Sequence, residues 1–192
     1  MNINEYQNYH ETKAHTSAEF PYNTYLCSIP LDFPGVPLHW HDELELVVIK
    51  RGQGFVSVDF DKRLVHSGDI IIIPPRCLHA IEQDDTFKME YENIIFKPDL
   101  LSSGANDLCM IQYIVPLLDG SLPIEYFLTP ALGSFEALSN CIRQIDLVCA
   151  DQTPGWQLAV KSSLFNFFFL LISERQKKTV STSSNSKSLE KM

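Results

Sequence analysis

One short stretch of the sequence brings together side chains that could bind a metal ion or a polar ligand. His39, His41 and Glu45 share parity, so on a single β-strand they would project from the same face. His79, beyond a second apolar run, would add a third imidazole. Neutral imidazole and carboxylate are ligands that Zn, Ni, Fe and Mn accept. The quartet predicts either a site for one such divalent metal or a polar cavity without metal.

Three further residues bear on this predicted cavity. Tyr91 combines an aromatic face with a hydroxyl on a predicted strand, so it is a candidate ligand contact or a packed core tyrosine. Glu43 has the parity of the quartet, but we expect it to be exposed because a buried unpaired carboxylate is costly. Trp40 has the opposite parity, and we expect it to pack.

Residues 25–96, which contain the candidate ligands, are predicted to form short strands that position them. Val56, Val58 and Phe60 alternate with polar residues, which predicts a half-buried strand with these three on its apolar face. Ile70–Ile73 is a continuous β-branched run bounded by Gly-Asp and Pro-Pro, which suits a strand buried on both faces. The pattern predicts a mainly β fold.

The apolar spacing changes to that of helices in the second half of the chain. A first helix is predicted around residues 106–115, and a second begins after Ser134 as N-cap. Thr153 and Pro154 announce a third. The second helix carries an apolar stripe that is either a dimer seam or a face packed on the strands: Leu138, Ile142, Ile145 and Cys149.

Charge and cysteine content narrow the function classes. The 192 residues carry 15 Lys+Arg against 24 Asp+Glu, a net charge of -9, which opposes binding to nucleic-acid phosphates or anionic membranes by this chain. The five scattered cysteines form no C-x-x-C pair, so we expect reduced thiols and a cytoplasmic location. The most apolar run, residues 164–172, is far shorter than the roughly 18 residues of a membrane span.

The spacing of the candidate ligands can be written as two blocks. H-x-H-x3-E-x6-G runs from His39 to Gly52, and G-x5-P-x-R-x2-H runs from Gly68 to His79. These blocks resemble those of the cupin superfamily. The chain over residues 37–101, the helices and the Ser-rich tail resemble more narrowly the effector-sensing domain of AraC-type transcriptional regulators.

The resemblance implies a cupin (double-stranded β-helix) barrel holding the four ligands inside, with an appended C-terminal helical dimerisation subdomain. It implies a non-catalytic sensor that binds a small-molecule effector, forms a homodimer through its C-terminal helices, and reaches DNA through a C-terminal domain missing from this chain. The alternative is a small metal-dependent cupin enzyme of dioxygenase or isomerase type. Against that alternative, the second block has Arg76 where cupins have Gly, and Gln83 where they have Asn.

The expected organisation has four parts, with no membrane segment. We expect residues 1–20 to be a flexible arm, 21–103 the cupin barrel, 104–178 the helical subdomain, and 179–192 a linker rich in Ser and Thr. We expect the bound effector to act by shifting the equilibrium between different arrangements of the arm, the helices and the linker.

Overall fold

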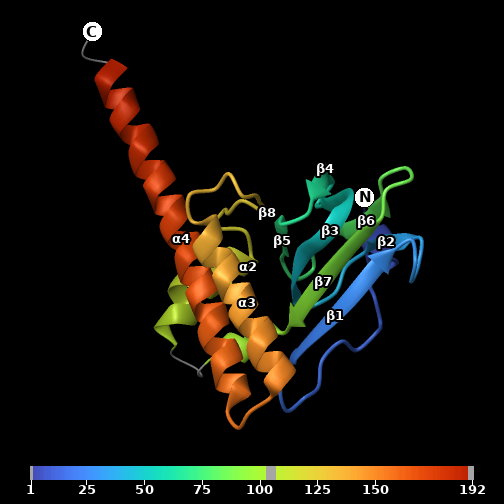
Figure 1. Cartoon of the computed structure of the whole chain (residues 1–192). Coiled ribbons are helices and arrows are strands. Elements are labelled where there is room, and N and C mark those ends of the chain that lie inside the picture. Colours follow the sequence, from blue (N-terminus) through green and yellow to red (C-terminus); the bar gives the residue numbers. More distant parts are fainter. Residues whose placement is uncertain (1, 103–106, 190–192) are drawn as a thin grey trace. The chain divides into compact units, whose positions relative to one another are not determined.

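β-Branched and aromatic residues are frequent in strands β1, β3, β5 and β7 of the computed structural model (Figure 1), which describes residues 2–102 and 107–189, with side chains up to Arg175. Eight strands pair antiparallel within the described residues. They are β1 Tyr22–Ile29, β2 Gly35–His39, β3 Leu44–Val58, β4 Asp61–His66, β5 Ile70–Ile73, β6 His79–Gln83, β7 Met89–Phe96 and β8 Phe127–Leu128. The predicted mainly antiparallel β architecture is confirmed for this part of the chain.

The long strand β3 joins two groups of strands. Its first half pairs with β5 and β7, and its second half pairs with β4 and β6. The register with β7 shifts between Ile49 and Arg51, and Gly52 follows with φ +77°. A Cβ on Gly52 would lie 1.8 Å from the Lys88 carbonyl oxygen, so only glycine allows this close approach of β3 and β7.

The apolar core formed by these strands lies between the two groups. Its members come from both groups: Ile29, Val47, Ile49, Val56, Val58, Val65, Ile71, Ile73, Ile81, Met89, Tyr91 and Phe127. Glu45 precedes Val47 and Ile49 on the same face of β3, so one interior holds the apolar core and the predicted ligand quartet. Ile70–Ile73 is fully buried along its length, as predicted.

One strand prediction is wrong at its end. β3 stops at Val58, and Asp59 and Phe60 form the turn into β4 with φ of 49° and 70°. Phe60 is 66% exposed instead of lying on the apolar face. The alternating pattern continues one step past the strand because periodicity does not encode where the backbone turns.

The residues before β1, which we expect to be a flexible arm, contact the residues around Trp40. Helix α1 covers Ile3–Gln7, and a parallel bridge joins His10 to Trp40. The Trp40 indole stacks on Tyr6 at 4.8 Å and on His10 at 4.2 Å between ring centroids, and its Nε1 donates to the Tyr6 carbonyl oxygen. Trp40 is therefore a packing residue, as predicted, and its partner is the arm.

The helices belong to a second compact unit. The strand unit comprises residues 1–102 and 125–129, including the 3₁₀ helix η1 Pro98–Leu101, and the helical unit comprises residues 103–124 and 130–192. The helical unit contains the π-helix η2 Met110–Ile114, α2 Val115–Leu118, α3 Phe135–Asp151 and α4 Trp156–Leu189. Residue 106, expected to begin the first helix, lies outside the described residues. The expected domain boundaries stay predictions.

Helices α3 and α4 lie side by side (Figure 1). α3 begins after Ser134 as predicted. Three residues of its predicted stripe, Leu138, Ile142 and Ile145, are buried, whereas Cys149 is only half-buried; Cys141 is buried beside them. On α4, Val160, Leu164, Phe167, Phe168 and Leu171 are buried. Both sets recur at helical spacing, so each helix buries one face.

α4 departs from expectation at both ends. It begins at Trp156, two residues after Pro154, and continues to Leu189 through the Ser-rich residues that we expect to be a linker; residues 190–192 lie outside the described part. Its segment Trp156–Arg175 is long and apolar enough to cross a membrane, contrary to the expectation from residues 164–172, but one such helix is weak evidence for a span. Most residues of that segment are not buried, which leaves apolar surface for a partner.

Candidate functional site

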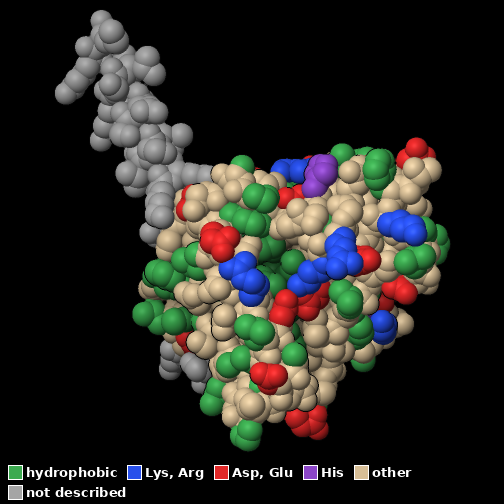
Figure 2. Space-filling model, viewed as in Figure 1, with side chains coloured by type: hydrophobic (Ala, Val, Ile, Leu, Met, Phe, Trp, Pro, Cys, Tyr) green, Lys and Arg blue, Asp and Glu red, His purple; other side chains and the backbone are tan. Residues whose placement is uncertain are grey.

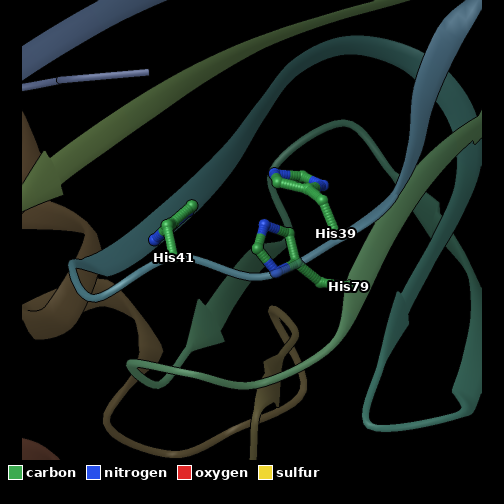
Figure 3. Close-up of side chains that lie close together, drawn as sticks. All are labelled: His39, His41 and His79. Carbon is green, nitrogen blue, oxygen red and sulfur yellow. The ribbon is translucent and has the colours of Figure 1, made fainter. Parts of the chain in front are cut away.

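The predicted ligand quartet converges, although not along one strand. His39 is the last residue of β2, His41 lies in the following turn, and Glu45 is the second residue of β3. His79 opens β6 and is the register partner of His39. The predicted single strand from His39 to Glu45 is therefore wrong, because the chain turns between them. Figure 3 shows the imidazoles of His39, His41 and His79 gathered together.

Backbone carbonyl groups set the orientation of all three imidazoles. Each Nδ1 contacts a carbonyl oxygen two residues away: His39 to Pro37 at 2.8 Å, His41 to Glu43 at 3.2 Å and His79 to Cys77 at 2.9 Å. Because a carbonyl only accepts, each Nδ1 carries a proton, and Nε2 is the ring atom left to face the cluster; that of His41 is hydrogen-bonded to Glu45. One ligand atom from each histidine lies within 4.8 Å of the others.

Glu45 is the anion at the centre of this cluster. Its side chain is 2% exposed, and its Oε2 lies 3.0 Å from His41 Nε2 and 3.3 Å from His79 Nε2. Burial alone would raise the pKa of Glu45, but the neighbouring His41 and His79 outweigh burial and hold that pKa well below its usual range. Glu45 is a carboxylate, and its second oxygen, Oε1, has no hydrogen-bond partner among the residues that the structure describes.

The pKa values of His41 and His39 are shifted in opposite directions. Burial would lower the pKa of His41, but the hydrogen bond and the charge of Glu45 outweigh it and raise that pKa. The pKa of His39 is lowered by burial first and by the charge of His79 second. Glu45 thus favours the protonated form of His41, whereas burial and His79 favour the neutral form of His39, the form that binds metals.

These residues line a cavity of about 370 Å³ within the strand unit. All five predicted site residues contribute to its wall, because Tyr91 of β7 also lines it. Tyr91 is fully buried, and burial, followed by the charges of Cys27 and Glu45, raises the pKa of its hydroxyl. That hydroxyl lies beside the Cys27 thiol, a weak partner, and bonds to no described oxygen or nitrogen.

Several polar atoms around the cavity are buried without a hydrogen bond. Five residues of the wall contribute one each: His15 Nδ1, Glu45 Oε1, His79 Nε2, the Tyr91 hydroxyl and Asn93 Oδ1. Native proteins leave few buried polar groups unpaired, and each such group costs about 1–3 kcal/mol. Their concentration around one cavity gives this wall several polar groups that water or a polar ligand can satisfy.

Sequence reasoning missed the arm's contribution to the cavity. Glu11, Lys13 and His15 all line it, and Glu11 Oε2 lies 2.8 Å from His15 Nε2 and 3.6 Å from His39 Nε2. The hydrogen bond with His15 is the largest cause that lowers the pKa of Glu11; burial opposes it, and the charges of the nearby histidines reinforce it. No local pattern announces these residues, because the stacking of the arm on Trp40 brings them to the cavity.

The alternation of side chains along the strands could have identified other residues of the cavity wall. Asn93 lies two residues after Tyr91 on β7, so the two share a strand face. Tyr25 and Cys27 share a face of β1 in the same way. Extending the alternation one step beyond Tyr91 is enough to place Asn93 on the cavity wall.

Glu43 contradicts the expectation that it is exposed. It is only 7% exposed, and its carboxylate lies 3.7 Å from His41 Nδ1. The raised pKa of His41 favours a cation there, which compensates the buried charge of Glu43. Glu43 does not line the cavity, because the turn after β2 directs it to the other ring nitrogen of His41.

The donor set fits a divalent transition metal. Three imidazoles offer Nε2, and each has its Nδ1 held by a carbonyl, the outer contact that orients metal-binding histidines. Glu45 Oε1 and His79 Nε2 are buried without a hydrogen bond. The histidine cluster can therefore bind a metal such as Zn, Ni, Fe or Mn.

Comparison with known proteins identifies the family. The sequence model of the AraC-like ligand binding domain matches residues 24–168. The chain belongs to this family.

The curated relatives of this AraC-like domain are regulators. It is 32% identical over 159 residues to the uncharacterized HTH-type transcriptional regulator YdeC of Bacillus subtilis, covering 82% of this chain and 54% of YdeC. It is 26% identical over 72 residues to the uncharacterized HTH-type regulator YbfI of the same organism, covering 38% of this chain and 26% of YbfI. The chain thus spans about half the length of YdeC. The resemblance expected from the sequence is confirmed.

Solved structures similar to this AraC-like domain include cupins. A cupin protein from Bacteroides fragilis is 22% identical with a TM-score of 0.38, covering 48% of this chain and 75% of that chain. A Cupin 2 conserved barrel domain protein from Salinispora arenicola is 23% identical with a TM-score of 0.36, covering 40% and 64%. At these TM-scores the likeness adds nothing to what the strand pairing establishes.

Proposed function

We propose that this chain is the effector-sensing part of an AraC-type transcriptional regulator and that its effector binds in the cavity of the strand unit. The concentration of unpaired buried polar atoms around that cavity carries the proposal. A ligand with hydroxyl, amide or carboxylate groups would complete their hydrogen bonds and recover part of the free energy lost in burying them. The site residues are His39, His41, Glu45, His79 and Tyr91.

A divalent metal is compatible with the same cavity. His39, His41, His79 and Glu45 would hold it, and it would supply a positive centre for an oxygen atom of the effector. The protein's own part is orientation, because the three carbonyl contacts keep each Nε2 directed at the site. In this proposal the site binds and does not catalyse.

Contact with DNA is assigned to a further domain of the regulator. This chain has a net charge of -9, and on the face seen in Figure 2 basic side chains lie among acidic ones without forming a continuous basic surface. Both curated relatives are named HTH-type regulators. The effector would act as a population shift between arrangements of arm, helices and linker, in a cytoplasmic protein.

We assign dimerisation to the helical unit. Its exposed large apolar side chains are Leu108, Ile111, Tyr113, Val115, Leu147, Leu158, Phe165 and Phe169. An apolar pocket lies between η2 and α4, with Tyr113 and Phe169 in its wall. A second copy of the chain is the occupant we propose, because the segment Trp156–Arg175 is apolar yet mostly unburied.

Light scattering of two charge variants tests this interface. Phe169→Glu, at 64% exposure on α4, should convert a dimer to a monomer at tens of micromolar protein. Leu26→Glu, at 76% exposure on β1, is the matched control and should leave the dimer intact. A wild-type protein that is monomeric at that concentration would refute the assignment.

A thermal-shift screen of small metabolites and divalent metals tests the effector site. A ligand at 100 times its Kd should stabilise the fold by about 2.7 kcal/mol, roughly 5–10 °C for a chain of this size. His79→Ala should abolish the shift caused by the metal or ligand, whereas His66→Ala, on exposed β4, should retain it. Equal shifts in both variants, with no metal found by elemental analysis, would remove the cavity from the proposal.

A further inference from the structure

The arm places a carboxylate in the mouth of the effector cavity. Glu11 is 29% exposed, and its Oε2 lies 2.8 Å from His15 Nε2 and 3.6 Å from His39 Nε2. His39 has its Nδ1 committed to the Pro37 carbonyl, so its Nε2 is the atom that faces Glu11. An acidic group of the protein itself therefore occupies the position next to the outermost imidazole of the cluster.

The other charged groups of the cavity wall make this mouth suitable for an anion. Lys13 lines the cavity on the exposed side, with Nζ 4.8 Å from the centroid of the Tyr25 ring, and forms no ion pair with a carboxylate among the described residues. Glu45 is the other carboxylate of the wall, and it is engaged deeper in the cavity by His41 and His79. Glu11 is thus the one wall carboxylate on the arm; it lies close to the imidazoles of His15 and His39, and Lys13 lines the same cavity.

We infer that the effector carries a carboxylate group that takes the place of the Glu11 carboxylate beside His15 and His39 and pairs with Lys13. The inference rests on the proposed effector site and specifies its ligand class. Inside the cavity, the Tyr91 hydroxyl and Asn93 Oδ1 would bind polar groups on the rest of the ligand. Glu11 acts as an intramolecular competitor that an anionic ligand displaces.

Two single substitutions follow with opposite effects. Glu11→Gln removes the competing charge and keeps the shape of the side chain, so it should tighten the binding of a carboxylate ligand at least threefold. Lys13→Met removes the pairing cation and should weaken binding at least threefold, in the range of a partly exposed ion pair. The matched controls, both exposed and outside the cavity wall, are Glu19→Gln and Lys88→Met, and both should leave affinity within twofold.

The probes are acids paired with their uncharged amides of nearly the same shape. They are benzoate and benzamide, phenylacetate and phenylacetamide, and malonate and malonamide, titrated into the wild-type chain and the four variants by calorimetry at 0.15 M salt. We expect at least one acid to bind tenfold or more tightly than its amide, with the opposite responses of the Glu11 and Lys13 variants.

Three results would overturn the inference. They are amides that bind as tightly as the acids, acid binding that the Lys13 variant leaves unchanged, and no acid binding to either the wild type or Glu11→Gln. The effector site itself would survive each of these results if the metabolite screen finds a neutral ligand whose binding is lost in His79→Ala. The two proposals therefore fail separately.

Discussion

Replacing Tyr91 by Phe would separate two effects of the buried hydroxyl in the cavity wall: its free-energy cost in the ligand-free protein and its contribution to ligand binding. The Tyr91 ring is fully buried in the core between the two groups of strands, and its hydroxyl lacks an oxygen or nitrogen partner. Phenylalanine keeps the ring and removes only the hydroxyl. The substitution should therefore stabilise the ligand-free protein, the reverse of what most core substitutions do.

The size of the effect follows from the environment of the hydroxyl. A buried hydroxyl without a hydrogen bond costs about 1–3 kcal/mol, and the nearby Cys27 thiol offsets part of that cost. We expect Tyr91→Phe to raise the free energy of unfolding by about 1 kcal/mol, or the Tm by roughly 2–4 °C. The same variant should bind the effector about tenfold more weakly, because a hydrogen bond to the ligand is lost.

Urea unfolding followed by circular dichroism measures the first effect, and calorimetry with the ligand from the screen measures the second. Tyr9→Phe, on the exposed arm, is the control and should change neither quantity. A loss of 1 kcal/mol or more in Tyr91→Phe would mean that the hydroxyl is already satisfied in the ligand-free protein. The unpaired polar atoms of the wall would then no longer indicate a ligand at this central residue.

Two further substitutions test the elements that position the site. Trp40→Ala removes the ring on which Tyr6 and His10 stack, so trypsin should cleave after Lys13 at least tenfold faster than in the wild type; an unchanged rate would show that the stacking does not hold the arm. Gly52→Ala should destabilise the fold by more than about 2 kcal/mol, because its Cβ would collide with the Lys88 carbonyl at a positive φ. Gly120→Ala has the same φ of +77° with open space around its Cβ, so a loss as large in this control would remove the collision from the explanation.

Periodicity predicted the elements whose burial is regular along the chain. Ile70–Ile73 is buried on both faces, and α3 begins after Ser134 with its apolar stripe inside. Both follow from local rules, because burial on a strand or helix repeats with the element's own geometry. The prediction that Phe60 lies on the apolar face was wrong, because the same alternation continues into the turn, where the backbone no longer follows the strand.

The sequence predicted which residue types form the site, but it did not predict the path of the backbone between them. His39, His41 and Glu45 do converge, but across a turn between β2 and β3, and that turn also buries Glu43 beside His41. His79 was chosen from the spacing of the two blocks, and strand register places it opposite His39. A turn of a few residues changes which side chains share a face, and parity cannot detect it.

The sequence by itself determined the donor chemistry of this protein: three imidazoles and a carboxylate at spacings that resemble one family, on strands set by alternating apolar residues. Only the tertiary structure decided that Glu11, Lys13 and His15 complete the cavity and that several of its polar atoms have no protein partner. The reason is physical. Periodicity along the chain records which side of an element is buried, whereas contacts between distant segments depend on how strands bend at Gly52 and where the arm stacks on Trp40.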